Sequence, residues 1–265
     1  MIALAFIMAL FMCQRDGPRF HVPVDFVNNV AVGLLVSGIA GSRLLHIVMF
    51  PGSYEWSDPI GWIAIWQGGL VFQGALPAGV LFCWFYARRK GVSFLAFADV
   101  LGPYLPLGHA IGRLGCFLNG CCYGRLSDAH WAIRFPRIPS DVSATPTGSP
   151  AYLDHLQAGF VQLTDAASLP VHPAQLYSLT GLVVVAGIMW VVRERWYPFP
   201  GVMIPAYFVL YGILRLVLEF FRGDHNPTHF GDLLSDQQVF SLLFFVIGAV
   251  LFAVIYVRRR QSPGA

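Results

Sequence analysis

Three arginines interrupt stretches of sequence that are otherwise apolar. Arg43, Arg113 and Arg215 each lie inside a run long enough for a membrane helix, and Glu219 follows Arg215 by four residues. A charge at membrane depth costs roughly 2.5 to 3.5 kcal/mol on insertion scales, so such residues are usually functional. Glu219 offsets the charge of Arg215 if the two form an i,i+4 pair, and a purely structural ion pair is the alternative interpretation.

The other two arginines have no acidic neighbour in the sequence. Three arginines around one carboxylate would leave net positive charge in a low-dielectric interior, so we expect an anion to complete the site. A guanidinium is planar, permanently charged and matches phosphate oxygens bidentately. The sequence therefore predicts a pocket for a phospholipid headgroup near the outer leaflet.

Two glycine-rich segments indicate where another group approaches the backbone closely. The first, GHAIGRLGCFLNGCCYG, runs from Gly108 to Gly124, and the second, WQGGLVFQGALPAG, covers residues 66–79. Such composition is poor for a helix and favours a broken helix that lines a cavity, although close packing of helices is the alternative. In the first segment His109, Arg113 and Asn119 favour function, whereas both interpretations stay open for the second.

Three cysteines cluster at Cys116, Cys121 and Cys122, close in sequence to His109. Their C-x4-C-C spacing matches no common zinc motif, and no fourth ligand is evident. A disulfide or simple packing of small residues is favoured over a metal site. We expect neither a metal nor a dissociable cofactor.

The composition indicates that the bilayer is the solvent. Of 265 residues, 56% are hydrophobic and 12% are charged, against about 25% charged in soluble domains. This excludes an ordinary soluble domain and a disordered chain. A net charge of +3 without a contiguous basic face also excludes a nucleic-acid binder.

Seven apolar runs predict an all-α, polytopic helical bundle that forms a single transmembrane domain over residues 1–265. The first run is too short, because 12 residues span about 18 Å and the hydrocarbon core is about 30 Å thick. We read it as part of a helix, since a signal peptide would need a basic segment before it and a small-residue cleavage site after it. The runs cover residues 1–13, 27–50, 66–87, 95–118, 174–192, 201–221 and 238–257.

Basic residues predict the orientation, because Arg and Lys are retained on the cytoplasmic side. They follow the first, third, fifth and last runs, so we expect a cytoplasmic C-terminus and external segments at 51–65, 119–171 and 222–237. The longest of these is expected to be an outer loop or a small outer lobe. The basic residues are Arg15, Arg19, Arg88, Arg89, Lys90, Arg193, Arg195, Arg258, Arg259 and Arg260.

Four motifs in order resemble those of the prolipoprotein diacylglyceryl transferases. They are WQGGLVFQGALPAG, GRLGCFLNGCCYGR at residues 112–125, HPAQLY at 172–177 and YGILRLVLEFFR at 211–222. The resemblance extends over residues 1–258. It implies a bacterial inner-membrane enzyme that moves the diacylglyceryl group of phosphatidylglycerol to the lipobox cysteine of a preprolipoprotein and releases glycerol phosphate. The implied partners are these two substrates and membrane lipid, with no nucleic acid.

The resemblance also implies roles for the arginines. Arg113 would hold the headgroup phosphate, and Arg215, steadied by Glu219, would hold or polarise the departing phosphate. The acceptor thiol, with a pKa of about 8.5 when free, would need a base or a positive field. The implied substrate-binding residues are Arg43, Arg113, Asn119, Gly124, His172, Arg215 and Glu219.

The chain departs from the family pattern at several positions. Gln73 stands where many members have a histidine, and glutamine cannot accept a proton at neutral pH. His109 is the local substitute for a base, unless it is a structural histidine. Cys116 and Cys121 replace the usual Asn and Glu, and part of the first helix, with a tyrosine, is missing. The expected catalytic residues are Gln73, His109, Arg113 and Arg215.

Two alternatives follow from these departures. A divergent member of the family would bind phospholipid without transferring it to a thiol, because the change at Gln73 affects the expected base. A small anion transporter would use Arg43, Arg113 and Arg215 as an ion path.

Overall fold

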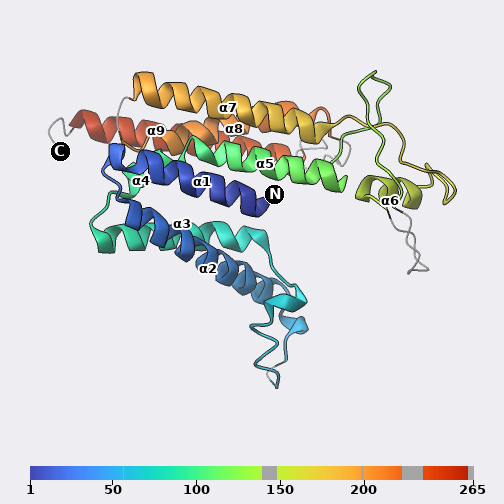
Figure 1. The fold of residues 1–265 in the computed structure, drawn as a ribbon, viewed down its shortest axis with the longest axis horizontal. Coiled ribbons are helices and arrows are strands. Elements are labelled where there is room, and N and C mark those ends of the chain that lie inside the picture. The colour runs from blue at the N-terminus through green and yellow to red at the C-terminus, as the bar shows by residue number, and fades with distance from the viewer. Residues whose placement is uncertain (56, 139–147, 198–199, 223–234, 262–265) are drawn as a thin grey trace. The chain divides into compact units, whose positions relative to one another are not determined.

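The computed structural model describes residues 1–265 except 56, 139–147, 198–199, 223–234 and 262–265. The described residues form α-helices joined by turns, short 3-10 helices and isolated β-bridges (Figure 1). This confirms the predicted class, an all-α polytopic membrane protein.

Each of the seven apolar runs contains a helix, and the fourth run contains two. A short helix, α6 (Pro150–Gln157), lies in the segment expected outside the membrane. The others are α1 (Ile2–Asp16), α2 (Val24–Met49), α3 (Phe72–Lys90), α4 (Phe94–Leu101), α5 (Tyr104–Asn119), α7 (Ala174–Trp196), α8 (Met203–Glu219) and α9 (Asp236–Gln261).

Three helices of the described chain are long and apolar enough to cross a membrane by themselves. They are α2, α7 and the Gln238–Arg258 part of α9, and α4 with α5 makes a fourth if the pair is one broken span. Helix α1 has 15 residues, which span about 22 Å and fall short of the hydrocarbon core. Helix α8 has 17 residues. The count of seven spans therefore stays a prediction.

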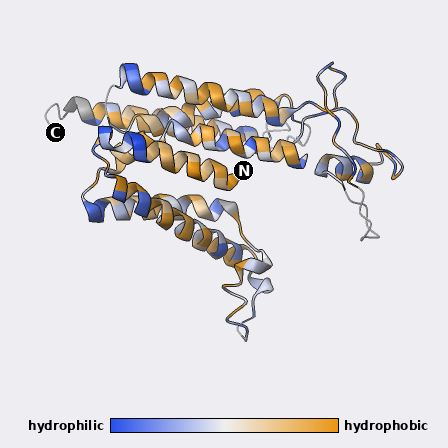
Figure 2. Ribbon diagram, in the orientation of Figure 1, coloured by the Kyte–Doolittle hydropathy of each residue, from blue (hydrophilic) through white to orange (hydrophobic). Residues whose placement is uncertain are grey.

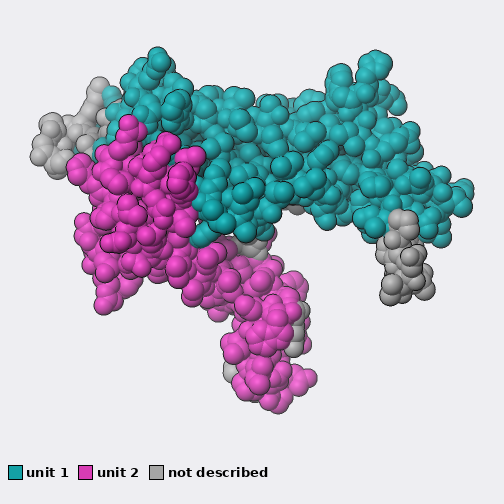
Figure 3. Space-filling view, viewed as in Figure 1, with its two compact units in different colours: residues 1–9, 101–265 teal, residues 10–100 magenta. Residues whose placement is uncertain are grey.

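The chain divides into two compact units, which Figure 3 colours separately. The first unit comprises residues 1–9 and 101–265, and the second comprises residues 10–100. The single transmembrane domain expected over the whole chain stays a prediction, and each unit is described by itself.

In the second unit, α2 and α3 pack closely in antiparallel directions. A Cβ on Gly74 would collide with the backbone of Gly41, so the two helices touch at glycines. Packing therefore accounts for Gly74, one of the glycines whose role the sequence left open. The rings of Phe26 and Tyr86 lie 5.4 Å apart, which places the start of α2 beside the basic end of α3.

In the first unit, α5 packs on α7, α7 on α8 and α8 on α9. Glycines again allow the closest approach: a Cβ on Gly212 would lie 2.8 Å from the Ser241 carbonyl oxygen. At one end of this unit Arg193 of α7 donates to the Tyr104 hydroxyl of α5 at 3.1 Å. Figure 2 shows hydrophilic residues at the end of α7 and apolar residues along the middle of the helices.

The segment after α5 forms a packed lobe. Phe135, Ala151 and Val171 are buried together, and Phe117 and Tyr123 pack against them. Backbone bridges join this lobe internally, for example between residues 133 and 171. Its position outside the membrane stays a prediction. Residues 139–147 of this segment, and 223–234 of the other expected external segment, lie outside the described residues.

The helix expected to break between Gly108 and Gly124 does not break where we predicted. Helix α5 continues through Gly108, Gly112 and Gly115 to Asn119. The interruption lies before it, between α4 and α5 at residues 102–103, where Pro103 supplies no backbone N–H. After Asn119, Gly120 adopts a left-handed conformation with φ 73° and caps the helix.

Candidate functional site

Two of the three arginines that the sequence singled out line one pocket in the first unit. Arg113 reaches it from α5 and Arg215 from α8, as the sequence predicted for these two. A third arginine, Arg222, follows the end of α8 and lines the same pocket. The remaining lining residues are Cys122, Ala174, Ser178 and Leu218.

Arg215 is held by the acidic residue that the sequence indicated. Its Nη1 lies 2.8 Å from Oε2 of Glu219, one turn further along α8, and both side chains are buried. The Ser235 hydroxyl donates to the other carboxylate oxygen at 2.8 Å. Because the pair is enclosed, each charge depends on its partner for compensation.

Arg113 is compensated less completely. Its Nε is buried, and within the described residues it has no hydrogen-bond partner. A buried donor without an acceptor costs roughly 1 to 3 kcal/mol, and more when it is charged. The described lining of the pocket contains the three arginines and no carboxylate, and Glu219 lies beside Arg215. An anion is the ligand that suits such a lining.

The pocket is nearly closed. Its cavity measures about 10 Å³, which is room for about one water molecule. A phosphate group therefore enters only when the lining side chains move apart. Long arginine side chains have the rotamer freedom for such a movement.

His109 lies one turn before Arg113 on α5 and faces aromatic residues of α8. Its Nδ1 is 3.5 Å from the Tyr207 hydroxyl, and its ring is 5.2 Å from the ring of Tyr211. The contact with Tyr207 is long for a hydrogen bond. His109 is half-buried, and its role as a base stays a prediction.

Gly124 joins three segments of the first unit. Its N–H donates to the His172 carbonyl at 2.9 Å, and it pairs with Arg222 in an isolated bridge. A Cβ would lie 2.6 Å from Cβ of His172 and 2.5 Å from the Phe221 carbonyl oxygen. Only glycine allows this approach, so Gly124 positions the segment that carries Arg222.

The other two predicted binding residues of this unit lie near its lobe. His172 is half-buried, and its Nδ1 is 3.1 Å from the Tyr177 hydroxyl. Asn119 is the last residue of α5 and is exposed. Neither is among the lining residues of the arginine pocket, so their roles in binding stay predictions.

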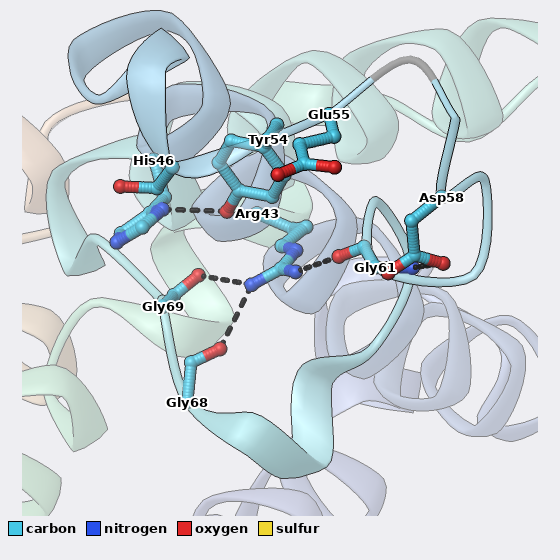
Figure 4. A pocket seen from close by; sticks show the side chains of 9 residues that line it. Arg43, His46, Tyr54, Glu55, Asp58, Gly61, Gly68 and Gly69 are labelled. Atoms are coloured by element: carbon cyan, nitrogen blue, oxygen red, sulfur yellow. Dashed lines mark hydrogen bonds between the residues drawn. The ribbon is translucent and has the colours of Figure 1, made fainter.

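Arg43 lies in the second unit, in a separate pocket of about 550 Å³ (Figure 4). It donates to the carbonyl oxygens of Trp62 at 3.0 Å, Gly68 at 2.8 Å and Gly69 at 3.0 Å, and also to that of Gly61. Backbone carbonyls thus accept from the guanidinium of Arg43, and its role in substrate binding stays a prediction.

The surroundings of this second pocket are acidic. Glu55 and Asp58 line it, together with His46, whose Nδ1 is 2.6 Å from the Tyr54 hydroxyl. Two carboxylates would repel a phosphate, so the pocket does not suit a phospholipid headgroup. Gln73, the residue expected at a catalytic position, also belongs to this unit, where it is exposed in the first turn of α3.

Sequence reasoning missed five of the seven described residues that line the arginine pocket, namely Cys122, Ala174, Ser178, Leu218 and Arg222. A signal existed for Arg222, since it follows Arg215 by seven residues and would share a helix face with it. Ser178 gave no such signal. Cys122 was considered only as part of a thiol cluster.

The fold and this pocket define a polytopic helical membrane protein with an arginine-rich cavity between its helices. A family model described as prolipoprotein diacylglyceryl transferase matches residues 1–254. The chain belongs to the prolipoprotein diacylglyceryl transferase family.

Curated relatives named phosphatidylglycerol–prolipoprotein diacylglyceryl transferase match nearly the whole chain. The protein of Geobacter sulfurreducens is 32% identical over 99% of this chain and 91% of its own. That of Bordetella avium is 34% identical over 99% of this chain and 90% of its own. That of Methylococcus capsulatus is 32% identical over 97% of this chain and 88% of its own.

Proposed function

We propose that this chain transfers the diacylglyceryl group of phosphatidylglycerol to the lipobox cysteine thiol of a preprolipoprotein. Membership of the family and the names of the relatives support this activity. The observation that carries it is the pocket shared by Arg113, Arg215 and Arg222, whose described lining brings three guanidinium groups together and contains no carboxylate.

The arginines suit the charge that develops in this reaction. The sulfur forms a bond to the glycerol carbon while the bond from that carbon to the phosphate oxygen breaks. The electron pair leaves with glycerol phosphate, and the thiol proton passes to a base. Guanidinium groups already in place stabilise the phosphate as its charge grows. In our proposal Arg113 and Arg222 hold the phosphate, and Glu219 keeps Arg215 oriented toward it.

His109 is the base that we propose for the thiol proton. It shares α5 with Arg113, one turn away, and a neutral imidazole has a ring nitrogen that can accept a proton. Gln73 cannot do so, and we propose that it contributes only a hydrogen bond. Gly124 and His172 shape the site, Asn119 contacts substrate, and Arg43 steadies the loop of residues 61–69.

The protein is proposed to lie in the bacterial inner membrane with its C-terminus in the cytoplasm. Arg193, near the end of α7, and Arg258, near the end of α9, both follow apolar helices. The positive-inside rule places such ends in the cytoplasm. The lobe at the other end of α5 then faces the exterior.

A reconstituted assay tests the activity. Purified protein is mixed with phosphatidylglycerol and a lipobox peptide, and the peptide mass is followed over time. We expect a mass gain equal to one diacylglyceryl group. A peptide with serine in place of the acceptor cysteine is the control and should gain nothing. If folded protein leaves the cysteine peptide unmodified, the proposal fails, and the divergent, non-transferring alternative replaces it.

A further inference from the structure

The first unit brings three thiols together beside the arginine pocket. The Sγ atoms of Cys116, Cys121 and Cys122 all lie within 4.8 Å of one another. We propose that these thiols form a binding site for a thiophilic divalent cation of the Zn²⁺ type. Neither the family pattern nor the proposed transfer reaction requires such a site.

The backbone turns sharply to make this cluster. Gly120 ends α5 in a left-handed conformation, and the Cys121 N–H then donates to the Cys116 carbonyl at 3.1 Å. Cys122 also has a positive φ of 55°, a left-handed backbone conformation that residues other than glycine rarely adopt. The buried Gln175 of α7 fixes the turn from outside, because its Nε2 donates to the Cys121 carbonyl at 2.8 Å.

The dimensions of the cluster suit a metal of this size. A Zn–S bond of about 2.3 Å requires sulfur atoms about 3.8 to 4.0 Å apart in tetrahedral or trigonal geometry. The three sulfurs are at most 4.8 Å apart. Rotamer adjustments of about 1 Å or less would close the site.

One thiol of the cluster lies beside the cationic side chains of the arginine pocket. Cys122 lines the same pocket as Arg113, Arg215 and Arg222. A nearby cation stabilises a thiolate over the neutral thiol. Since binding displaces the thiol protons, metal affinity should rise with pH.

A fourth position is left open in this arrangement. Three protein ligands with one free position are typical of reactive rather than purely structural zinc sites. The Oε1 of Gln175 is buried and has no hydrogen-bond partner among the described residues. This acceptor belongs to a side chain that already contacts the cluster, since Nε2 of Gln175 donates to the Cys121 carbonyl.

A titration with Cd²⁺ tests the site directly. The full-length protein is reduced with a phosphine in detergent, and the thiolate-to-cadmium charge-transfer absorption is followed. We expect one Cd²⁺ per chain, displacement by Zn²⁺, and release of protons in weakly buffered solution. The titration contains no lipid or peptide, so its outcome is independent of the proposed transfer activity.

Serine variants assign the ligands. Cys116→Ser, Cys121→Ser and Cys122→Ser should each weaken Cd²⁺ binding by more than about 100-fold, the upper end of what loss of an outer-shell partner costs. Cys83→Ala is the matched control, because that buried cysteine lies in the other unit, and it should bind Cd²⁺ as the native chain does. Melting temperatures close to that of the native protein establish that the serine variants are folded.

Three results would overturn the proposal. They are the absence of charge-transfer absorption in the reduced native protein, absorption that survives in the folded serine variants, and equal loss of absorption in Cys83→Ala. Counting the free thiols before and after reduction shows whether two of the cysteines form a disulfide. If two of the three cysteines form a disulfide and the reduced protein binds no Cd²⁺, the cluster is a redox pair and not a metal site.

Discussion

Arg215 and Glu219 lie one turn apart in α8 and form a buried ion pair, with Nη1 and Oε2 2.8 Å from each other. The ion pair orients the guanidinium of Arg215 in a pocket that Arg113 and Arg222 also line. Because Ser235 donates to the second oxygen of Glu219, the carboxylate is fixed from both sides. Removing it would leave three arginines together without their acidic neighbour.

Replacing Glu219 by glutamine should therefore destabilise the protein and lower its activity. Breaking one side of a buried ion pair typically costs about 3 to 5 kcal/mol. Thermal unfolding in detergent measures the change, and Asp128→Asn, at an exposed residue of the lobe, is the control. A melting temperature equal to that of the native chain would show that the pair contributes nothing to stability.

Arg113→Lys should keep the charge but lose transfer activity. A lysine ammonium cannot present the planar, bidentate donors that match a phosphate, and losing one such donor costs about 100-fold in turnover. The rate of peptide modification measures the loss. Arg134→Lys, an exposed arginine of the lobe, should leave the rate unchanged. If Arg113→Lys does likewise, positive charge alone is sufficient at this position.

Gln73→His should retain or raise the transfer rate. An imidazole at the position where the family commonly has one can accept the thiol proton, and a general base contributes about 100-fold or more when well placed. The pH profile of the rate is the measurement, and it should gain a new rise near the pKa of histidine. Complete inactivation would count against the placement of this motif near the reaction.

Gly124→Ala should lower both stability and activity. The added Cβ would lie 2.6 Å from Cβ of His172, and such overpacking costs about 1 to 3 kcal/mol. It would also shift the segment that carries Arg222. Gly187→Ala is the matched control, because no atom lies within 4 Å of a Cβ there, and alanine favours a helix interior. Equal melting temperatures for the two variants would contradict this account of Gly124.

Lowering the pH below about 6.5 should weaken the lobe through His155. Burial lowers the pKa of this histidine, an effect only partly opposed by Asp154, and its Nδ1 accepts from the Leu169 N–H at 3.1 Å. Between the lowered folded pKa and the unfolded value, the unfolded chain binds more protons. The contribution of His155 to the free energy of unfolding is therefore complete above the pKa of the unfolded chain. It is lost as the pH falls from that value toward the lowered pKa of the folded protein.

Melting temperatures at about pH 7.5 and about pH 5.5 measure this effect. The native protein should lose stability between them, and His155→Gln should lose less, because its amide does not titrate. An identical pH dependence in the two proteins would assign the loss to other groups.

The helices could be predicted from the sequence because apolar runs near 20 residues long are a strong signal. Each predicted run contains a helix with ends within a few residues of the expected ones, except that α3 begins at Phe72. The break between α4 and α5 was placed too late. The Gly102–Pro103 pair was the better signal, since proline removes a backbone donor whereas the glycines of α5 only reduce helix propensity.

The site could be predicted only in part. Arg113 and Arg215 were found because a charge is conspicuous in an apolar run, but the partners of Arg43 are backbone carbonyls of residues 61–69, which no residue type indicates. The cysteine cluster was dismissed on its spacing. It forms because Gly120 reverses the chain after α5, and such a turn brings together sulfurs that a linear motif separates.

The central claim is that the pocket of Arg113, Arg215 and Arg222 holds the phosphate of the lipid donor. Crosslinking with a phosphatidylglycerol analogue that carries a photoreactive group on its headgroup, followed by peptide mapping, tests this claim most directly. We predict labelling of Ala174, Ser178 and Leu218, which line the pocket, and loss of this labelling when unlabelled phosphatidylglycerol competes. Competable labelling confined to Tyr54–Gly69, around the pocket of Arg43, would contradict the account.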